Sequence, residues 1–371
     1  MAGSGEEIKK LGFGLMRLPQ KDGHIDIEQT KEMVDLFMEA GFTYFDTAWA
    51  YDGSEEAARE ALVERYPRDS FKLATKTAPW TGSKTKEEAW AQFDESLART
   101  GAGYFDYYLL HNVGEERTQI YDRFDMWDFI REKKEAGLIR NMGFSFHSTP
   151  EELDELLEKH PEVDFVQLQL NYADWENPGI QSRACYEVAR KHGKPIVVME
   201  PVKGGMLAEP PEKVKELLHA AEPEASCASW AIRFSASLPG VITVLSGMSD
   251  VAQMKDNISY MKDFTGLTKK EQGVIEKAQK LISEVPLIPC TDCNYCAKVC
   301  PNNIGISGIF KAVNQGRLYG KKYAISSIQF TIQAGGKAGP DKCVQCGQCE
   351  KVCPQHIAIR DGLKEAAEIL H

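Results

Sequence analysis

Short apolar segments alternate with longer amphipathic segments from residue 12 to about residue 265. The short segments are rich in β-branched and aromatic residues, and the longer ones have the apolar spacing of helices. The expected strands are residues 12–18, 43–48, 71–76, 105–111, 139–146, 165–171, 195–200 and 241–247. Strands that alternate with helices form parallel sheets, so this pattern predicts repeated βα units.

Eight βα units in about 250 residues predict a closed (β/α)8 TIM barrel, because this is the usual size of that fold. An open, doubly wound sheet is the main alternative, but no Gly-rich fingerprint follows the first expected strand. Thr149, Pro150 and Glu152 fit an N-cap, a first helical position and a capping-box partner. Glycines suited to left-handed helix ends follow three other expected helices, at Gly41, Gly137 and Gly193.

The chain is acidic, with 55 Asp and Glu against 44 Lys and Arg and a formal net charge of -11. Nucleic acids and anionic membranes attract basic surfaces, so neither is an expected partner. Residues 1–10 lack the apolar core of a signal peptide, and no stretch approaches the roughly 20 apolar residues of a membrane span. A cytoplasmic location is therefore expected.

A second domain is expected after residue 282, where the composition changes at EVPLIPC. This assigns residues 1–282 to the barrel and residues 283–371 to the second domain. Eight of the ten cysteines lie in the second domain, in two groups with the same spacing and a proline after each. The groups are Cys290, Cys293, Cys296 and Cys300, and Cys343, Cys346, Cys349 and Cys353. The other two, Cys185 and Cys227, are expected to be core residues.

Cysteine groups with this spacing indicate two [4Fe–4S] clusters. Zinc is the alternative, but zinc sites usually combine two separated CxxC pairs, whereas three thiols at three-residue steps followed by Cys-Pro suit a cubane. In two-cluster ferredoxins, the fourth cysteine of each group binds the other cluster, so Cys353 is expected with the first group and Cys300 with the second. The domain is expected to be a small ferredoxin-like fold, α+β or helical, with a helix within residues 301–342.

Four residues of types used in proton transfer lie at consecutive expected strand ends. Asp46, Lys76 and His111 end the second, third and fourth strands, and Tyr51 follows Asp46 in the same loop. Barrel active sites lie at this edge. A buried Lys lowers the pKa of a nearby phenol, a carboxylate holds the Lys in place, and a His orients a carbonyl oxygen. The four residues together predict an acid–base catalytic site.

The motifs FDTAWAY, LATK and YYLLH resemble those of the aldo-keto reductase family in order and spacing, and the likeness extends over the whole first domain. The resemblance implies a (β/α)8 barrel, a nicotinamide cofactor, and a tetrad of Asp46, Tyr51, Lys76 and His111. It further implies that Tyr51 gives a proton to a substrate carbonyl oxygen while hydride reaches the carbonyl carbon.

The resemblance also nominates cofactor contacts. The segments GFSFH and FVQLQLNY resemble those that hold the carboxamide, through Ser145 and Gln167, whereas Phe146 and Met199 replace the Asn and Tyr of many members. Contacts to the nucleotide are expected in the loops and the helix after the last two strands, at Lys203, Ser246, Gly247, Ser249, Gln253 and Asn257. These loops lack the usual cations for a 2′-phosphate, so NADH is expected to bind at least as well as NADPH.

Four aromatic residues lie on expected loops at the same edge: Trp49, Trp80, Tyr172 and Trp175. They are expected either to wall an apolar substrate pocket or to anchor their loops.

Nicotinamide transfers two electrons as hydride, whereas a [4Fe–4S] cluster accepts one electron at a time, and a flavin exchanges both. We therefore expect an oxidoreductase that acts on a small organic carbonyl or alcohol with NAD(H) or NADP(H), and that exchanges single electrons with a ferredoxin or flavoprotein partner. Two alternatives stay open: a ferredoxin-dependent reductase with FMN in the barrel, and a redox-sensing or electron-carrier module without catalysis. Structural clusters are a further alternative.

Overall fold

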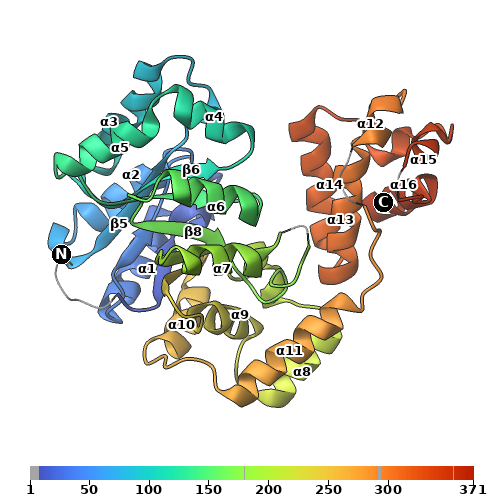
Figure 1. Cartoon of the computed structure of the whole chain (residues 1–371). Helices are drawn as coiled ribbons and strands as arrows, with labels where there is room; N and C mark the ends of the chain where they lie inside the picture. The colour runs from blue at the N-terminus through green and yellow to red at the C-terminus, as the bar shows by residue number, and fades with distance from the viewer. Residues whose placement is uncertain (1–7, 179, 291–293, 354) are drawn as a thin grey trace. The chain divides into compact units, whose positions relative to one another are not determined.

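The computed structural model describes residues 8–178, 180–290, 294–353 and 355–371 (Figure 1). The chain forms two compact units. Unit 1 comprises Met1–Gly204 and Ala228–Gln272, and unit 2 comprises Gly205–Cys227 and Gly273–His371. The expected domain boundary after residue 282 stays a prediction.

Eight parallel strands close into a barrel in unit 1 (Figure 1), which confirms the (β/α)8 prediction. The strand order around the barrel follows the chain, and β1 (Leu11–Gly14) closes the ring by pairing with both β4 (Tyr44–Asp46) and β10 (Val241–Ser246). The remaining strands are β5 (Lys72–Thr77), β6 (Phe105–Val113), β7 (Ile139–Phe146), β8 (Phe165–Gln169) and β9 (Ile196–Met199).

The first strand is shorter than expected. It ends at Gly14, and a 3-10 turn at Leu15–Arg17 follows. A small hairpin of β2 (Gln20–Lys21) and β3 (His24–Ile25) comes next, and the sequence analysis missed it. Its turn residues, Asp22 and Gly23, have φ values of 53° and 80°. Asp-Gly is the usual sequence of such a turn, because both central residues must adopt left-handed conformations.

Successive residues of a strand point to opposite faces, so every second side chain of each strand points into the barrel. An apolar layer there consists of Tyr44, Ala74, Leu109, Phe165, Val197 and Leu245. A Cβ on Gly143 would lie 2.5 Å from the Phe165 carbonyl oxygen, so the glycine makes room for this layer. Two residues further along β4, β5 and β8, the layer becomes polar, with Asp46, Lys76 and Gln167.

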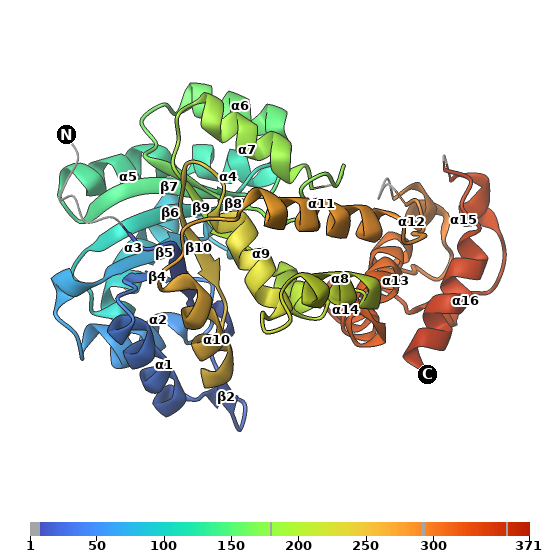
Figure 2. The same cartoon turned by 90° about the horizontal axis from the view of Figure 1, so that it is seen from below.

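Helices surround the strands, and α1 (Ile27–Glu39) lies beside α10 (Val251–Met261) (Figure 2). The other helices of the barrel are α2 (Ser54–Ala58), α3 (Lys86–Thr100), α4 (Glu116–Arg123), α5 (Met126–Glu135), α6 (Pro150–Lys159), α7 (Ser182–Lys191) and α9 (Cys227–Ala236). Other helical turns are Arg59–Val63, Arg68–Ser70, Pro79–Thr81 and Lys203–Ala208. No helix in the described part of the chain has both the length and the apolar composition needed to span a bilayer.

The predicted helix ends are mostly confirmed. Thr149 caps α6 by accepting a hydrogen bond from the Glu152 amide (3.3 Å), with Pro150 at the first position. The capping-box prediction for the Glu152 side chain was wrong, because its carboxylate accepts from the Glu115 amide (2.8 Å) and the Thr118 hydroxyl (3.0 Å) instead. The three predicted end glycines have φ values of 81°, 77° and 65°, at Gly41, Gly137 and Gly193.

Unit 2 is helical and contains an internal repeat. Its helices are α8 (Glu212–Ala221), α11 (Lys269–Ser283, which starts in unit 1), α12 (Tyr295–Val299), α13 (Ile306–Tyr319), α14 (Lys321–Gly335), α15 (Gln348–Lys351) and α16 (Ile359–Leu370), with a 3-10 turn at Pro340–Lys342. In each repeat a short helix carries the third cysteine and a longer helix follows, so α12 and α13 correspond to α15 and α16. Left-handed residues occupy equivalent positions, Asn294 with Gly347 and Asn303 with His356. The helix expected within residues 301–342 is α13, and α14 was missed.

Candidate active site

A buried ion pair lies at the carboxyl ends of β4 and β5. The Lys76 ammonium donates to Asp46 Oδ1 (2.5 Å) and to the Thr47 carbonyl (2.7 Å), and the two charged side chains are only 1% and 5% exposed. Gln167 Nε2 donates to the other Asp46 oxygen (3.2 Å). Burial lowers the pKa of Lys76, but the neighbouring Asp46 and Tyr51 outweigh burial and raise it. Lys76 is therefore held as an ammonium ion.

Tyr51 lies against this ammonium in the loop after β4. The Lys76 nitrogen is 5.1 Å from the centre of the Tyr51 ring. Burial raises the pKa of the Tyr51 phenol above its ordinary value, and Lys76 only partly opposes the rise. The sequence analysis expected a lowered pKa, and that net direction was wrong because burial outweighs the ammonium. A phenol with a raised pKa stays protonated at neutral pH and keeps a proton to donate.

The His111 side chain completes the group. Its ring lies 5.6 Å from the Tyr51 ring, edge to face at 85°, and the Trp80 ring is 5.8 Å away. Trp80 Nε1 (2.8 Å) and the Tyr121 hydroxyl (2.5 Å) both donate to the His111 carbonyl and fix this part of the strand. Burial, aided by the Lys76 charge, lowers the pKa of His111 well below its ordinary value, so the imidazole is neutral. The structure thus brings together all four residues selected from the strand ends.

The residues nominated for the carboxamide lie side by side, because Ser145 of β7 pairs in register with Gln167 of β8. Ser145 Oγ accepts a hydrogen bond from the Asn112 amide (2.7 Å). Asn112 was missed by the sequence analysis. It sits at an irregularity of β6 with φ 58°, and its side-chain oxygen is buried without a partner among the described residues. The residue whose amide bonds to Ser145 thus carries a buried side-chain acceptor without a partner, and a carboxamide nitrogen needs such an acceptor.

Phe146 and Met199, the two departures from the family pattern, differ in their surroundings. Phe146 is 2% exposed and belongs to the core between strands and helices, with its ring 6.2 Å from that of Phe144. Phe146 therefore packs in the core instead of facing the interior of the barrel. Met199 is half-buried at the end of β9.

The residues nominated in the last loop make hydrogen bonds to one another. Ser246 Oγ accepts from Asn257 Nδ2 (2.7 Å), and Gln253 Oε1 accepts from the Ser249 amide (2.9 Å). The Asp250 carboxylate caps α10 by accepting from the Gln253 amide (2.8 Å). Gly247 is exposed. An acidic cap at this position disfavours a second anion, so the nominated loop alone makes a weak phosphate site.

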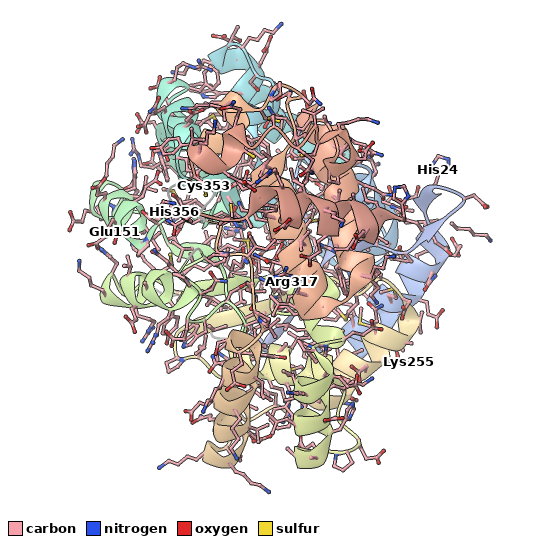
Figure 3. The ribbon with its side chains drawn as sticks, turned by 90° about the vertical axis from the view of Figure 1, so that its right-hand side faces the viewer. His24, Glu151, Lys255, Arg317, Cys353 and His356 are labelled. Atoms are coloured by element: carbon pink, nitrogen blue, oxygen red, sulfur yellow. The ribbon has the colours of Figure 1, made fainter. Side chains whose placement is uncertain are left out.

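Lys203 was nominated as a second anion contact after β9. Its ammonium donates to Asp174 Oδ1 (2.6 Å), and the Asp174 side chain is 1% exposed. The other Asp174 oxygen accepts from Asn171 (2.9 Å) and Gln169 (3.1 Å). Lys203 is thus held by a buried carboxylate. Lys255, labelled in Figure 3, is exposed on α10.

Arg17 lies next to both loops, and the sequence analysis did not select it. It follows β1, which pairs with β10. Its guanidinium donates to the carbonyl of Gly204, which follows β9 (3.4 Å). Its methylene carbons lie beside Gly247, because a Cβ added to that glycine would be 3.6 Å from the nearest of them. Phosphate sites of TIM barrels commonly use the loops after the seventh and eighth strands, which here are β9 and β10. An exposed guanidinium thus lies next to the last loop, whose residues 246–250 include no Lys or Arg.

The four rim aromatics have different surroundings. Trp80 contacts His111, as described for that residue. Trp49 Nε1 donates to Glu95 (2.7 Å), and the guanidinium of Arg99 lies 5.2 Å from its ring. The Tyr172 and Trp175 rings pack against Phe234 of α9 at 6.3 and 5.5 Å. Of these four, Trp80 is the one placed at the tetrad, and the other three act as loop anchors.

Nine of the ten cysteines lie within the described residues, and Cys293 lies outside them. Within the described chain, no three His, Cys, Asp or Glu side chains are arranged to hold a single metal ion. Seven thiols instead line two cavities of unit 2. One is lined by Cys300, Cys343, Cys346 and Cys349. The other is lined by Cys290, Cys296 and Cys353.

The fourth cysteine of each group thus lies with the other group. Cys353 and His356, labelled in Figure 3, lie between α15 and α16, and the His356 amide donates to the Cys353 carbonyl (3.1 Å). Thiolates are the usual ligands of [4Fe–4S] clusters, so the lining of both cavities fits that group. Cys185 and Cys227 are 6% and 5% exposed, and both are core residues as expected.

Sequence comparison matches residues 10–280 to the aldo/keto reductase family and residues 289–358 to the 4Fe-4S dicluster domain. An aldo-keto reductase of Mycolicibacterium smegmatis is 29% identical over 208 residues, which cover 56% of this chain and 69% of that protein. A 9,11-endoperoxide prostaglandin H2 reductase of Trypanosoma cruzi is 27% identical over 201 residues, which cover 53% of this chain and 63% of that protein.

Solved structures share the barrel fold. An aldo-keto reductase of Bacillus halodurans in its holo form has a TM-score of 0.59 and 24% identity, covering 73% of this chain and 92% of that one. An aldo-keto reductase of Klebsiella pneumoniae in complex with NADPH has a TM-score of 0.58 and 20% identity, covering 73% and 90%. The chain belongs to the aldo/keto reductase family of oxidoreductases, and it carries a 4Fe-4S dicluster domain after the barrel.

Proposed function

We propose that this oxidoreductase interconverts a small organic carbonyl and its alcohol with a nicotinamide cofactor, and that it exchanges single electrons through two [4Fe–4S] clusters. The observation that carries the proposal is that the Tyr51 ring lies near both the Lys76 ammonium (5.1 Å) and the neutral His111 ring (5.6 Å). A protonated phenol beside a fixed cation is suited to donate a proton to a carbonyl oxygen.

Each member of the tetrad has a separate role in this proposal. Tyr51 donates its proton to the substrate oxygen, and Lys76 stabilises the phenolate that remains. Asp46 keeps Lys76 charged and in place through their 2.5 Å contact. The neutral His111 ring orients the substrate oxygen. A nicotinamide held beside these residues would supply the hydride that the carbonyl carbon receives.

The cofactor contacts follow from the neighbouring strands. Ser145, Gln167 and Asn112 hold the carboxamide, with Asn112 taking the place of the Asn that Phe146 replaces in the family pattern. Arg17 binds the diphosphate beside Ser246, where a guanidinium makes strong, charge-assisted hydrogen bonds.

In unit 2, each [4Fe–4S] cluster takes its fourth ligand from the other cysteine group. One cluster uses Cys300 with Cys343, Cys346 and Cys349, and the other uses Cys353 with Cys290, Cys293 and Cys296. The thiol sets of the two cavities support this crossed assignment. Because hydride carries two electrons and a cluster takes one, a flavin, held either by the barrel or by a partner flavoprotein, is proposed to divide the pair.

The experiment for the barrel uses two matched substitutions. Tyr51→Phe removes the proposed proton donor, and Tyr66→Phe makes the same chemical change at a phenol that donates to Asp35 on α1. With a panel of aldehydes and ketones and either nucleotide, Tyr51→Phe is expected to lower kcat/KM by ~100-fold or more, the usual cost of losing a general acid. Tyr66→Phe is expected to keep the wild-type value. Near wild-type turnover by Tyr51→Phe would contradict the assignment.

The experiment for the clusters uses protein purified without oxygen. About eight irons per chain and paramagnetic resonance of reduced cubane clusters are expected. Zinc in place of iron would contradict the proposal. Stopped-flow bleaching then tests the flavin step. In flavin-free protein, NADH alone is expected to reduce the clusters slowly, and added flavin or a flavoprotein is expected to speed their reduction. Fast bleaching by NADH in flavin-free protein would remove the need for a flavin.

A further inference from the structure

One stretch of unit 2 differs sharply in charge from the rest of the chain. Residues 294–340 contain six Lys and Arg and no Asp or Glu, in a protein whose net charge is -11. Two of these cations are paired, Arg317 with Glu365 and Lys322 with Glu209. Three others, Lys298, Lys311 and Lys337, lie around one groove.

This groove, called the lysine groove, is lined by residues of α12, α13 and α14 and of the segments next to them. No acidic side chain is among its described lining residues. Thr331 of α14 fits closely against α13, because a Cβ on Gly308 would lie 2.8 Å from its methyl group. Phe330, which is 71% exposed, stands at the edge of the groove and also lines a second hollow along the same two helices. An exposed phenyl group next to lysine side chains offers a partner both an apolar and a charged contact.

The lysine groove and one cysteine cavity share a wall. Asn294, Ile306 and Ser307 line both the groove and the cavity that contains Cys290, Cys296 and Cys353. The Ser307 hydroxyl donates to the Asn294 side-chain oxygen (2.7 Å) and closes this wall. A molecule bound in the groove is therefore one layer of residues away from the cavity.

We propose that the lysine groove is the docking surface for a small acidic protein that carries single electrons, of the ferredoxin class. The proposal rests on the proposed function, because it requires a cluster in the cavity. In each encounter the partner's centre is oxidised by one electron and the cluster is reduced by one, and two encounters supply the two electrons of one hydride equivalent. Complementary charge supports this occupant, because opposite charges on two proteins raise the rate of productive encounter.

The test measures cluster reduction by a reduced, acidic [2Fe–2S] ferredoxin in an anaerobic stopped-flow instrument. The groove variant carries Lys298→Glu, Lys311→Glu and Lys337→Glu. At low ionic strength its second-order rate is expected to fall by ~10-fold or more, the lower end of electrostatic steering effects. The wild-type rate is expected to fall steeply as salt is added, and the variant rate to depend little on salt.

A matched control has the same change in net charge elsewhere in unit 2. It carries Lys213→Glu, Lys277→Glu and Lys280→Glu, three exposed lysines of α8 and α11. At about 0.15 M ionic strength, where the Debye length is about 8 Å, its rate is expected to stay within about twofold of wild type, whereas the groove variant is expected to stay slower. An equal fall in both variants, or a wild-type rate in the groove variant, would overturn the proposal. Phe330→Ala, which keeps every charge, is expected to slow reduction at high salt.

Two further measurements distinguish ferredoxin docking from damage to the clusters and from a different occupant of the groove. Dithionite is a small reductant that needs no docking, so it is expected to bleach the clusters of all variants equally. Failure of dithionite to bleach wild-type protein would instead refute the clusters of the proposed function. If the groove variant loses binding to a labelled RNA oligonucleotide, or loses self-association in sedimentation, while its ferredoxin rate is unchanged, the groove belongs to that other occupant.

Discussion

Asp46→Asn and Lys76→Met each break the buried ion pair of the barrel and leave one charge without its partner. Both charged side chains are at most 5% exposed, so solvent screens neither. Removing one partner of a buried pair typically costs about 3–5 kcal/mol, because the remaining charge stays desolvated. We expect each variant to lose that much free energy of unfolding. The double variant is expected to lose less than the sum of the two single variants, because it leaves no unpaired charge.

The two single variants are expected to respond to pH in opposite directions. In Lys76→Met, burial of Asp46 is no longer opposed by Lys76, so the pKa of the folded carboxyl lies above its unfolded value. Stability is then lost as the pH rises through that folded pKa. In Asp46→Asn, burial lowers the pKa of Lys76, and the opposing effect of Asp46 is gone. The unfolded state then binds more protons, so stability increases as the pH rises toward the ordinary lysine pKa.

Urea unfolding followed by tryptophan fluorescence measures these changes. All six tryptophans lie between residues 49 and 230, in the barrel, so the signal reports this part of the chain. Titrations at pH 5, 7 and 9 give the slope for each variant. Single variants within about 1 kcal/mol of wild type would be typical of a solvent-exposed pair, and would refute a buried one. If the unfolding free energies of the two single variants changed with pH in the same direction, the assigned pKa shifts of Asp46 and Lys76 would be refuted.

Three other predictions follow from the site. Burial raises the pKa of Tyr51, so its phenol keeps its proton at neutral pH. We therefore expect kcat/KM for carbonyl reduction to stay level through neutral pH and to fall only above the ordinary pKa of tyrosine. A fall centred near pH 8 would indicate another proton donor. Arg17→Gln is expected to weaken the binding of NADH and of NADPH by a similar ~10-fold, which is about the contribution of one charged hydrogen bond. Binding isotherms measure both affinities. A loss of affinity for NADPH alone would place Arg17 at the 2′-phosphate instead. The double variant Cys300→Ser/Cys343→Ser removes two ligands of one cluster, so it is expected to retain about four irons per chain. The double variant Cys300→Ser/Cys290→Ser removes one ligand from each cluster, so it is expected to lose both. The reverse result would show that each cluster is bound by a single cysteine group.

The barrel and the position of its site could be predicted because both depend on local patterns. Alternation along a strand is a property of neighbouring residues, and it places Asp46 and Lys76 two residues beyond the apolar layer of Tyr44 and Ala74. Consecutive parallel strands then bring these ends together at one edge. The repeated cysteine spacing is likewise local, and it predicted two equivalent cysteine groups, whereas the repeated helices around them came from the structure.

Other features depended on contacts between residues far apart in the chain. Arg17 meets Gly204 and Gly247 only because β1 closes the barrel against β10. The backbone amide of Asn112 reaches Ser145 at an irregularity in β6 that the sequence did not reveal. The direction of the Tyr51 pKa shift also required the structure, because it depends on whether burial or the Lys76 charge is stronger.

The same division applies to unit 2. The sequence alone determined which thiols form each group, since spacing is local, and the absence of acidic residues from 294 to 340 is visible in it. Only the tertiary structure decided that α14 packs against α13, that three lysines thereby surround one groove, and that Asn294 and Ser307 separate the groove from a cysteine cavity. The reason is physical: the helix pairing that places these side chains together depends on close packing at Gly308, and no pattern within either helix encodes its partner.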